Sequence, residues 1–317
     1  MMNNHNEAGL SEVIGFILLL GLVAAAFSMW MVYVVPANGR EAEIIQMDSV
    51  KERFTDYKIS LDSLWINSNN QSNVPLSYVT LSTSINLGTG GGNTQVSGLF
   101  LPMLNPLASS AVISIQNTRE SMNITYNSSV DNRTTSRQYW MNSLQYQTQN
   151  YYWIQQQYEY QDGGVFLSQE NRTICRVSPP ISLVNNSDIS NTVDLTPIQI
   201  YGGGSIGGNG PVRVDTRLRA LQQAHTQKKY WVNISVNVTD YSTAIMWRGI
   251  FDDARRNGGI TNTSWYTLGN SSPSATPGRA FINISGPYSG FQKEDVTLTI
   301  RPVEYSVFLN NIAPMTF

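Results

Sequence analysis

The stretch VIGFILLLGLVAAAFSMWMVYVV, Val13 to Val35, decides the fold of this chain of 317 residues. It is almost entirely apolar, and no charged side chain occurs from residue 13 to residue 37. Its 23 residues form a helix of about 35 Å, enough to cross a hydrocarbon core of about 30 Å. Trp30 and Tyr33 near its far end suit a membrane interface. The alternative, a helix buried in a soluble core, fits poorly because such helices rarely run this long without a polar face.

The segment after this stretch predicts a second, amphipathic helix over residues 40–65. Pro36 removes one helical hydrogen bond and Gly39 loosens the backbone, so we expect a kink or flexible joint between the two helices. Beyond the joint, apolar residues recur every three or four positions and predict one packed stripe. The stripe consists of Ile44, Met47, Val50, Phe54, Tyr57, Leu61 and Leu64. The charged residues between them, which we expect to face water, are Arg40, Glu41, Glu43, Asp48, Lys51, Glu52, Arg53, Asp56 and Lys58.

Strand signals replace the helical pattern after a polar loop, Asn67 to Asn73. Apolar and polar residues alternate in several short runs, such as Val232 to Val238, and this pattern is typical of antiparallel sheets with one face in water. The alternation changes phase across Arg301-Pro302, which predicts a bulge or strand break. Residues 67–317 are therefore expected to form a β-rich region, either one sheet pair or two subdomains.

One helix is expected to interrupt the strands, with its apolar face on Met246, Trp247, Ile250, Phe251 and Ala254. Ser242 or Thr243 is available as its N-cap. Arg255 and Arg256 complement the C-terminal dipole before Asn257-Gly258 ends the helix. The expected fold class is thus α+β, with a long hydrophobic N-terminal α-helix followed by a mainly antiparallel, β-sandwich-like region that carries one accessory helix.

The segment Ala8-Gly9-Leu10-Ser11-Glu12-Val13-Ile14-Gly15, followed by the apolar run, resembles the N-terminal signature of archaeal type IV pilins. The rest of the chain is similar, less sharply, to larger pilin-like proteins of methanogenic archaea. In that family a peptidase on the cytoplasmic side cuts just before the hydrophobic segment, and the freed helices bundle as the filament core. The resemblance implies a leader of residues 1–7 and a cut between Glu7 and Ala8, next to Gly9. The helix of residues 8–66 would then hold the filament or membrane core at 13–35.

The resemblance also implies a role for Glu12. After such a cut Glu12 is the fifth residue, and in bacterial pilins a glutamate at that place pairs with a neighbouring subunit's new amino terminus. A carboxylate at the edge of an apolar bundle is costly unless it is paired, so this role is physically reasonable. The alternative is that Glu12 only marks where the membrane ends.

Sites for N-linked glycans are frequent in the β-rich region. The eleven Asn-x-Ser/Thr sequons are about twice as many as chance placement gives at this composition. Several of them lie opposite the apolar positions of an expected strand, which is the side where a glycan finds solvent. The alternative is that a face rich in Asn, Ser and Thr produces sequons by accident. The candidates are Asn70, Asn123, Asn127, Asn132, Asn171, Asn185, Asn233, Asn237, Asn262, Asn270 and Asn283.

Aromatic residues gather between Tyr139 and Tyr160, where eight tyrosines and tryptophans alternate with Gln and Asn. Aromatic faces beside amide groups can bind sugars or pack against a partner subunit. The favoured interpretation is a hairpin whose aromatic rows fill a core and pair across strands.

The composition argues against catalysis and nucleic-acid binding. The net charge is −2 and only 13% of residues are charged, about half the usual share, so the chain has no basic surface for nucleic acid. Two histidines rule out a multi-histidine metal site, and a single cysteine, Cys175, excludes an intrachain disulfide. The glycine clusters lack the Lys-Ser/Thr of a phosphate loop, and no Gly-x-Ser-x-Gly elbow occurs. We therefore expect no enzyme, cofactor or metal.

The apolar helix predicts a membrane-anchored cell-surface protein, and the resemblance implies that this helix packs with identical or related pilin subunits after a stage in the membrane. The leading hypothesis is a structural subunit, major or minor and adhesive, of an archaeal type IV pilus-like filament. Its β-rich region would lie outside the cell, carry N-linked glycans and contact a surface or carbohydrate ligand. The alternative is a single-pass membrane-anchored surface glycoprotein that does not assemble.

Overall fold

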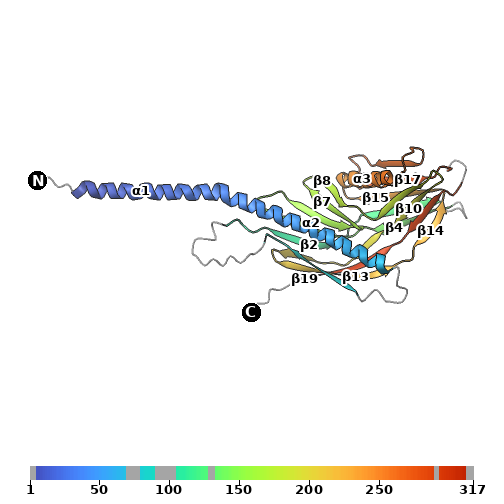
Figure 1. Ribbon diagram of the computed structural model, residues 1–317, viewed down its shortest axis with the longest axis horizontal. Coiled ribbons are helices and arrows are strands. Elements are labelled where there is room, and N and C mark those ends of the chain that lie inside the picture. The colour runs from blue at the N-terminus through green and yellow to red at the C-terminus, as the bar shows by residue number, and fades with distance from the viewer. Residues whose placement is uncertain (1–4, 69–78, 90–104, 128–132, 289–292, 312–317) are drawn as a thin grey trace.

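A long helical rod projects from a β-rich body in the computed structural model, which describes residues 5–68, 79–89, 105–127, 133–288 and 293–311 (Figure 1). One continuous helix comprises α1 (His5–Met29), a π-helical turn η1 (Trp30–Val34) and α2 (Val35–Ser68); α1 and η1 form the projecting rod, and α2 packs against the body. The helix does not break at Pro36. Instead the Val35 N–H bonds to the carbonyl of Trp30, five residues back, so the helix widens one turn ahead of the proline. A π-turn at this place changes the hydrogen-bond ladder where the proline ring would otherwise meet the carbonyl four residues earlier.

The strands form four sheets, and the neighbours in each sheet are antiparallel except for the parallel pairs β10–β18 and β11–β19. One four-stranded sheet has the order β1 (Thr80–Asn86), β13 (Pro211–Leu221), β19 (Val303–Asn311), β11 (Ile198–Tyr201). The other has the order β14 (His225–Lys229), β18 (Val296–Ile300), β10 (Ser190–Leu195), β9 (Ile181–Asn186). The six-stranded sheet has the order β12 (Ser205–Gly208), β2 (Ser110–Gln116), β5 (Ser143–Gln149), β6 (Gln156–Gln161), β7 (Gly164–Gln169), β8 (Arg172–Val177). The five-stranded sheet has the order β16 (Tyr266–Asn270), β17 (Gly278–Ser285), β15 (Trp231–Val238), β3 (Ser121–Asn127), β4 (Thr134–Trp140).

The expectation of a β-sandwich is wrong, because the four sheets have a propeller-like arrangement. Prolines explain part of the division, since a proline cannot donate to a ladder. The run from β18 to β19 breaks at Pro302, as the phase change predicted, and the neighbouring run from β10 to β11 breaks at Pro197. Backbone bonds from Arg301 N to Leu195 O (2.9 Å) and from Val303 N to Pro197 O (2.9 Å) join the two runs across the break. Each run therefore contributes to two sheets.

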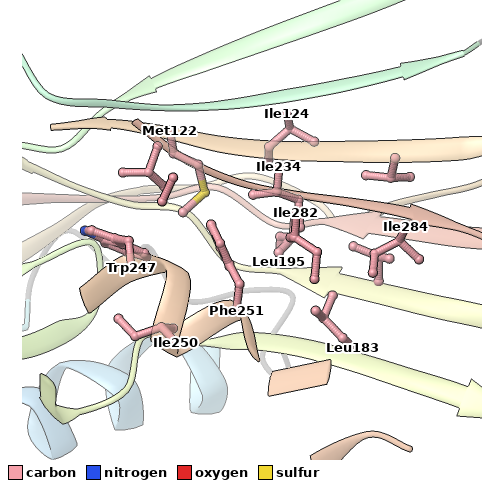
Figure 2. Packing of buried hydrophobic residues seen from close by; sticks show 14 of the residues in the cluster. Met122, Ile124, Leu183, Leu195, Ile234, Trp247, Ile250, Phe251, Ile282 and Ile284 are labelled. Carbon is pink, nitrogen blue, oxygen red and sulfur yellow. The ribbon is translucent and has the colours of Figure 1, made fainter. Parts of the chain in front are cut away.

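Two hydrophobic clusters fill the body. The first surrounds α2, which contacts β1 and β13 on one sheet and β6 and β7 on another. The second lies between the five-stranded sheet and β9, β10 and β18, and it includes the apolar face of α3 (Tyr241–Asn257). Figure 2 shows Trp247, Ile250 and Phe251 of α3 in this second cluster. The strand residues beside them are Met122, Ile124, Leu183, Leu195, Ile234, Ile282 and Ile284.

The accessory helix α3 has the predicted face and the predicted end at Asn257, followed by Gly258. Its N-cap differs from the two expected candidates. Asp240 is the cap, and its carboxylate accepts a hydrogen bond from Thr243 N (2.9 Å). An aspartate in this position satisfies a free N–H and also complements the helix dipole, so it outcompetes a hydroxyl further into the first turn.

Candidate functional site

The apolar part of the rod is the most unusual surface of the molecule. Every residue from 12 to 33 is exposed, on all sides of the helix. Leu18, Leu22 and Tyr33 keep 69%, 72% and 70% of their surface exposed. Each buried Å² of such surface stabilises by about 25 cal/mol, so a rod this apolar gains strongly from lipid or from other helices around it.

The same helix is long and apolar enough to cross a membrane. Among the described residues it is the one helix that meets this requirement, and its most apolar window is 0% buried. A helix that is apolar on all sides belongs in a bilayer or inside a larger helical assembly. The expectation of a long apolar N-terminal helix is confirmed, and by length and composition such a helix could be a membrane anchor or a signal.

The residues of the implied cleavage site lie on this helix. Glu7, Ala8 and Gly9 fall within the backbone of α1, and their side chains lie outside the described residues. Glu12 is exposed at the start of the described side chains. No hydrogen bond or ion pair of Glu12 occurs within the described part of the chain, so its carboxylate is open to a partner.

The amphipathic helix α2 packs into the body along its apolar face. The predicted stripe is confirmed: Met47, Val50, Phe54, Tyr57 and Leu61 are at most 4% exposed. Polar groups also hold α2 in place, because the Tyr57 hydroxyl lies 2.8 Å from the Thr216 hydroxyl. Burial at this position raises the pKa of the Tyr57 phenol. Tyr305 Oη donates to the carbonyl of Leu61 (2.7 Å). The helix cannot slide along its axis without losing these bonds.

Glu43 and Lys58 correct the prediction that the charged residues of this helix face water. Glu43 is 1% exposed and Lys58 is 7% exposed. The Glu43 carboxylate accepts hydrogen bonds from Tyr151 N (2.7 Å) and Tyr152 N (2.9 Å), and Lys58 pairs with Asp62. Buried charges are tolerated when they are paired in this way. Residues 151–152 are more than a hundred positions away, so no local pattern reveals the partner of Glu43.

Two more contacts join the same loop to the first turns of α2. A Cβ atom on Gly39 would lie 2.3 Å from the ring of Tyr152, so only a glycine admits this ring against the helix. The Arg40 guanidinium stands over the ring of Trp153, 4.3 Å from its centroid. Gly39 therefore serves close packing rather than the flexible joint that we expected. We call Gly39, Arg40, Glu43 and the loop residues Tyr151, Tyr152 and Trp153 the collar, since they lie where the rod leaves the body.

The aromatic segment from Tyr139 to Tyr160 takes the favoured role of core. Tyr146 and Tyr158 contact Phe54, with ring centroids 6.5 and 6.0 Å apart, and Tyr160 contacts Tyr57 at 5.2 Å. These rings come from β5 and β6 and cover α2. Trp140 and Tyr151 remain 49% and 63% exposed.

The sequon asparagines occupy the surface wherever the structure describes them. Asn171 and Asn262 are exposed and lie in loops, Asn171 between β7 and β8 and Asn262 between α3 and β16, and the other seven described positions are half-buried. Asn262 Oδ1 accepts hydrogen bonds from Ser264 N (3.0 Å) and Ser264 Oγ (2.8 Å), while Asn185 Nδ2 donates to Asp188 Oδ1 (2.7 Å). The half-buried positions are Asn123, Asn127, Asn185, Asn233, Asn237, Asn270 and Asn283. Asn70 and Asn132 lie outside the described residues.

Within the described residues, no three His, Cys, Asp or Glu side chains gather closely enough to hold a metal ion. Comparison with known proteins identifies no relative: no protein-family model matches the chain, and neither the curated proteins nor the solved structures contain a match.

Proposed function

We propose that this chain is a structural subunit of a type IV pilus-like surface filament. The observation that carries the proposal is the division of one continuous helix into two parts. The first is the apolar rod, exposed on all sides, and the second is α2, whose apolar stripe is buried in the body and which we call the seat. A plain anchor needs only the rod. A filament subunit also needs a body that fixes the direction of the rod, and the contacts of the collar and of α2 fix it.

In this proposal the rods of many subunits pack side by side and the β-rich bodies face outward. Apolar side chains on every side of the rod suit such packing, because each rod in a bundle meets neighbours in several directions. Glu12 lies at the edge of the apolar stretch with its carboxylate unoccupied by the described residues. A new amino terminus of a neighbouring subunit, released by a cut between Glu7 and Ala8, would neutralise it. The proposal assigns the chain no catalysis.

A single-pass anchored surface glycoprotein is the second candidate. The length of the apolar stretch favours it, since 23 residues match one crossing of a hydrocarbon core of about 30 Å. Such a protein needs no cut before Ala8 and no neighbouring subunit.

The mature N-terminus and the surface morphology together decide between the two candidates. Mass spectrometry of the native protein should find Ala8 as the first residue, and electron microscopy should find filaments that contain this chain. A protein that keeps Met1 and never occurs in filaments would contradict the filament proposal and support the plain anchor.

The proposed outward position of the body predicts glycans on its accessible sequons. We expect Asn171 and Asn262 to be occupied first, because both are exposed and lie in loops outside the helices and strands. Glycopeptide mass spectrometry of the native protein checks this, with the half-buried positions as the internal comparison. If Asn171 and Asn262 are bare in every molecule, the chain is not exposed to a glycosylating compartment or these sites are not used, and the glycan part of the proposal is wrong.

A further inference from the structure

An open groove of about 640 Å³ lies on the five-stranded sheet, far from the rod in sequence. Its floor and walls include Thr125 of β3, Trp231 and Asn233 of β15, and Arg279, Phe281 and Asn283 of β17. The alternate residues of the same strands, such as Ile234 and Ile282, are 0% exposed and belong to the second hydrophobic cluster. The groove is therefore on the outer face of the sheet, and its volume is typical of small-molecule sites.

The strand register places hydrogen-bonding groups in a row across this groove. Asn233 lies opposite Asn283, and each is flanked on its other side by a threonine, Thr125 on β3 and Thr267 on β16. Directly opposite residues have Cβ atoms about 5 Å apart, so the row offers two amides and two hydroxyls close enough together to contact one ligand.

Aromatic residues flank the row on both sides, because the two central strands run antiparallel. Trp231 comes two residues before Asn233, and Phe281 comes two residues before Asn283 on the facing strand. The Phe281 ring covers Gly269, where a Cβ atom would lie 2.7 Å from the ring. The Arg279 guanidinium stands over the same ring, 5.7 Å from its centroid. Phe281 thus holds the arginine at the groove, while the half-buried Trp231 offers a flat apolar surface.

We propose that this groove binds an acidic oligosaccharide. Amides and hydroxyls suit the hydroxyl groups of a pyranose, and an indole suits its apolar C–H face. Among the described residues that line the groove, Arg279 is the one charged side chain and none is a carboxylate, so a carboxylate on the ligand would complete an ion pair. The proposal does not rest on filament assembly.

The chain's own glycan is the competing occupant, since Asn233 and Asn283 are both sequon positions. The two asparagines lie directly opposite each other, so glycans attached to both would crowd one another. Both asparagines are also half-buried between the aromatic side chains, which fits a hydrogen-bonding floor better than an attachment point. The proposal therefore commits to a ligand that is not attached to the chain.

The test uses the full-length protein in detergent, after mass spectrometry of its peptides. The probes are two acidic tetrasaccharides, of galacturonate and of mannuronate, and neutral maltotetraose, each titrated by calorimetry. We expect at least one acidic tetramer to bind roughly tenfold or more tightly than maltotetraose, as a charge-assisted pair gives. Arg279→Gln should remove this preference, whereas Arg248→Gln, at an exposed position of α3 outside the groove, should keep it.

Trp231→Ala should weaken binding of all three tetramers by a similar factor, and Trp231→Phe should restore most of the affinity. Unchanged thermal midpoints of the variants show that the body is intact; if Trp231→Ala does not fold, the Arg279→Gln pair decides. The proposal is overturned if no acidic tetramer binds, or if Arg279→Gln leaves the preference intact. A glycan found on Asn233 or Asn283 of the native protein would overturn it in favour of the attached occupant.

Discussion

The two parts of the N-terminal helix differ in surroundings although they form one continuous element. Phe27 in α1 is 53% exposed, and Phe54 in α2 is 0% exposed. The difference follows from the residues between the apolar ones. Polar and charged residues leave α2 with a single apolar stripe, and the β-rich body covers that stripe. The rod α1 is apolar on every side, so packing along one face would leave most of its apolar surface uncovered. The comparison teaches that the seat stabilises the folded chain and that the rod is available for association.

The largest expected effect separates the two regions by the same substitution in each. Phe54→Ala should lower the free energy of unfolding of the body by about 3–5 kcal/mol, because it leaves a cavity against Tyr146 and Tyr158. Phe27→Ala should change it by less than about 0.5 kcal/mol, since its side chain meets none of the body. Denaturant unfolding in detergent, followed by tryptophan fluorescence, measures both. Equal losses in the two variants would contradict the division.

The reverse comparison introduces a charge into the rod. Leu22→Arg should weaken partition of the chain into membranes or filaments by about 3 kcal/mol, the cost of a charge at the centre of an apolar helix. The free energy of unfolding of the body should stay unchanged, because Leu22 is 72% exposed. Sedimentation of membranes and filaments, with quantification of the soluble fraction, measures the effect. A variant that sediments like the wild type would show that the rod is not the associating surface.

The collar sharpens the comparison at the point where the two regions meet. Glu43→Gln should cost about 1–3 kcal/mol of unfolding free energy, since it weakens the charge-assisted bonds to Tyr151 N and Tyr152 N. Glu41→Gln is the matched control, because Glu41 is exposed on the same turn. Hydrogen exchange at residues 151 and 152 should increase in Glu43→Gln alone. Unchanged exchange there would mean that the carboxylate does not hold the loop.

The last comparison contrasts Glu43 with another buried carboxyl, Asp162, which is 3% exposed and accepts from one backbone N–H, that of Ile198 (2.9 Å). Burial raises the pKa of Asp162 from 3.8 to about 8. Between pH 3.8 and about pH 8 the Asp162 carboxyl is ionised in the unfolded chain but still protonated in the folded chain. Rising pH therefore lowers the free energy of unfolding by up to about 1.4 kcal/mol per pH unit in this range.

Asp162→Asn keeps an oxygen acceptor for Ile198 N and removes the ionisable group. The variant should therefore unfold with a flatter pH dependence between about pH 4 and pH 8, and it should be the more stable protein at the upper end. Denaturant midpoints across this range measure the slope. Parallel profiles of the variant and the wild type would contradict the raised pKa.

Sequence patterns with a short reach predicted much of this molecule. The uninterrupted apolar run required a long exposed or lipid-facing helix, because a helix with no polar face cannot lie on a soluble body. The stripe from Met47 to Leu61 identified the packed face of α2, and Asn257-Gly258 marked the end of α3. The phase change at Pro302 located a real strand break. Each of these features depends on residues a few positions apart.

Only the tertiary structure decided the features that join distant residues. The partner of Glu43 is more than a hundred positions away. Position 39 requires a glycine because the ring of Tyr152 packs against the helix there. The groove exists because Asn233 and Asn283 share a register that alternation alone does not specify. Alternation says which face of a strand is apolar, but it leaves open which strand lies beside it and where a run changes sheet. The local sequence therefore determined an apolar helix that lipid or other helices must cover, and strands with one buried face. The pairing of those strands, which depends on the tertiary structure, produced four sheets instead of a sandwich.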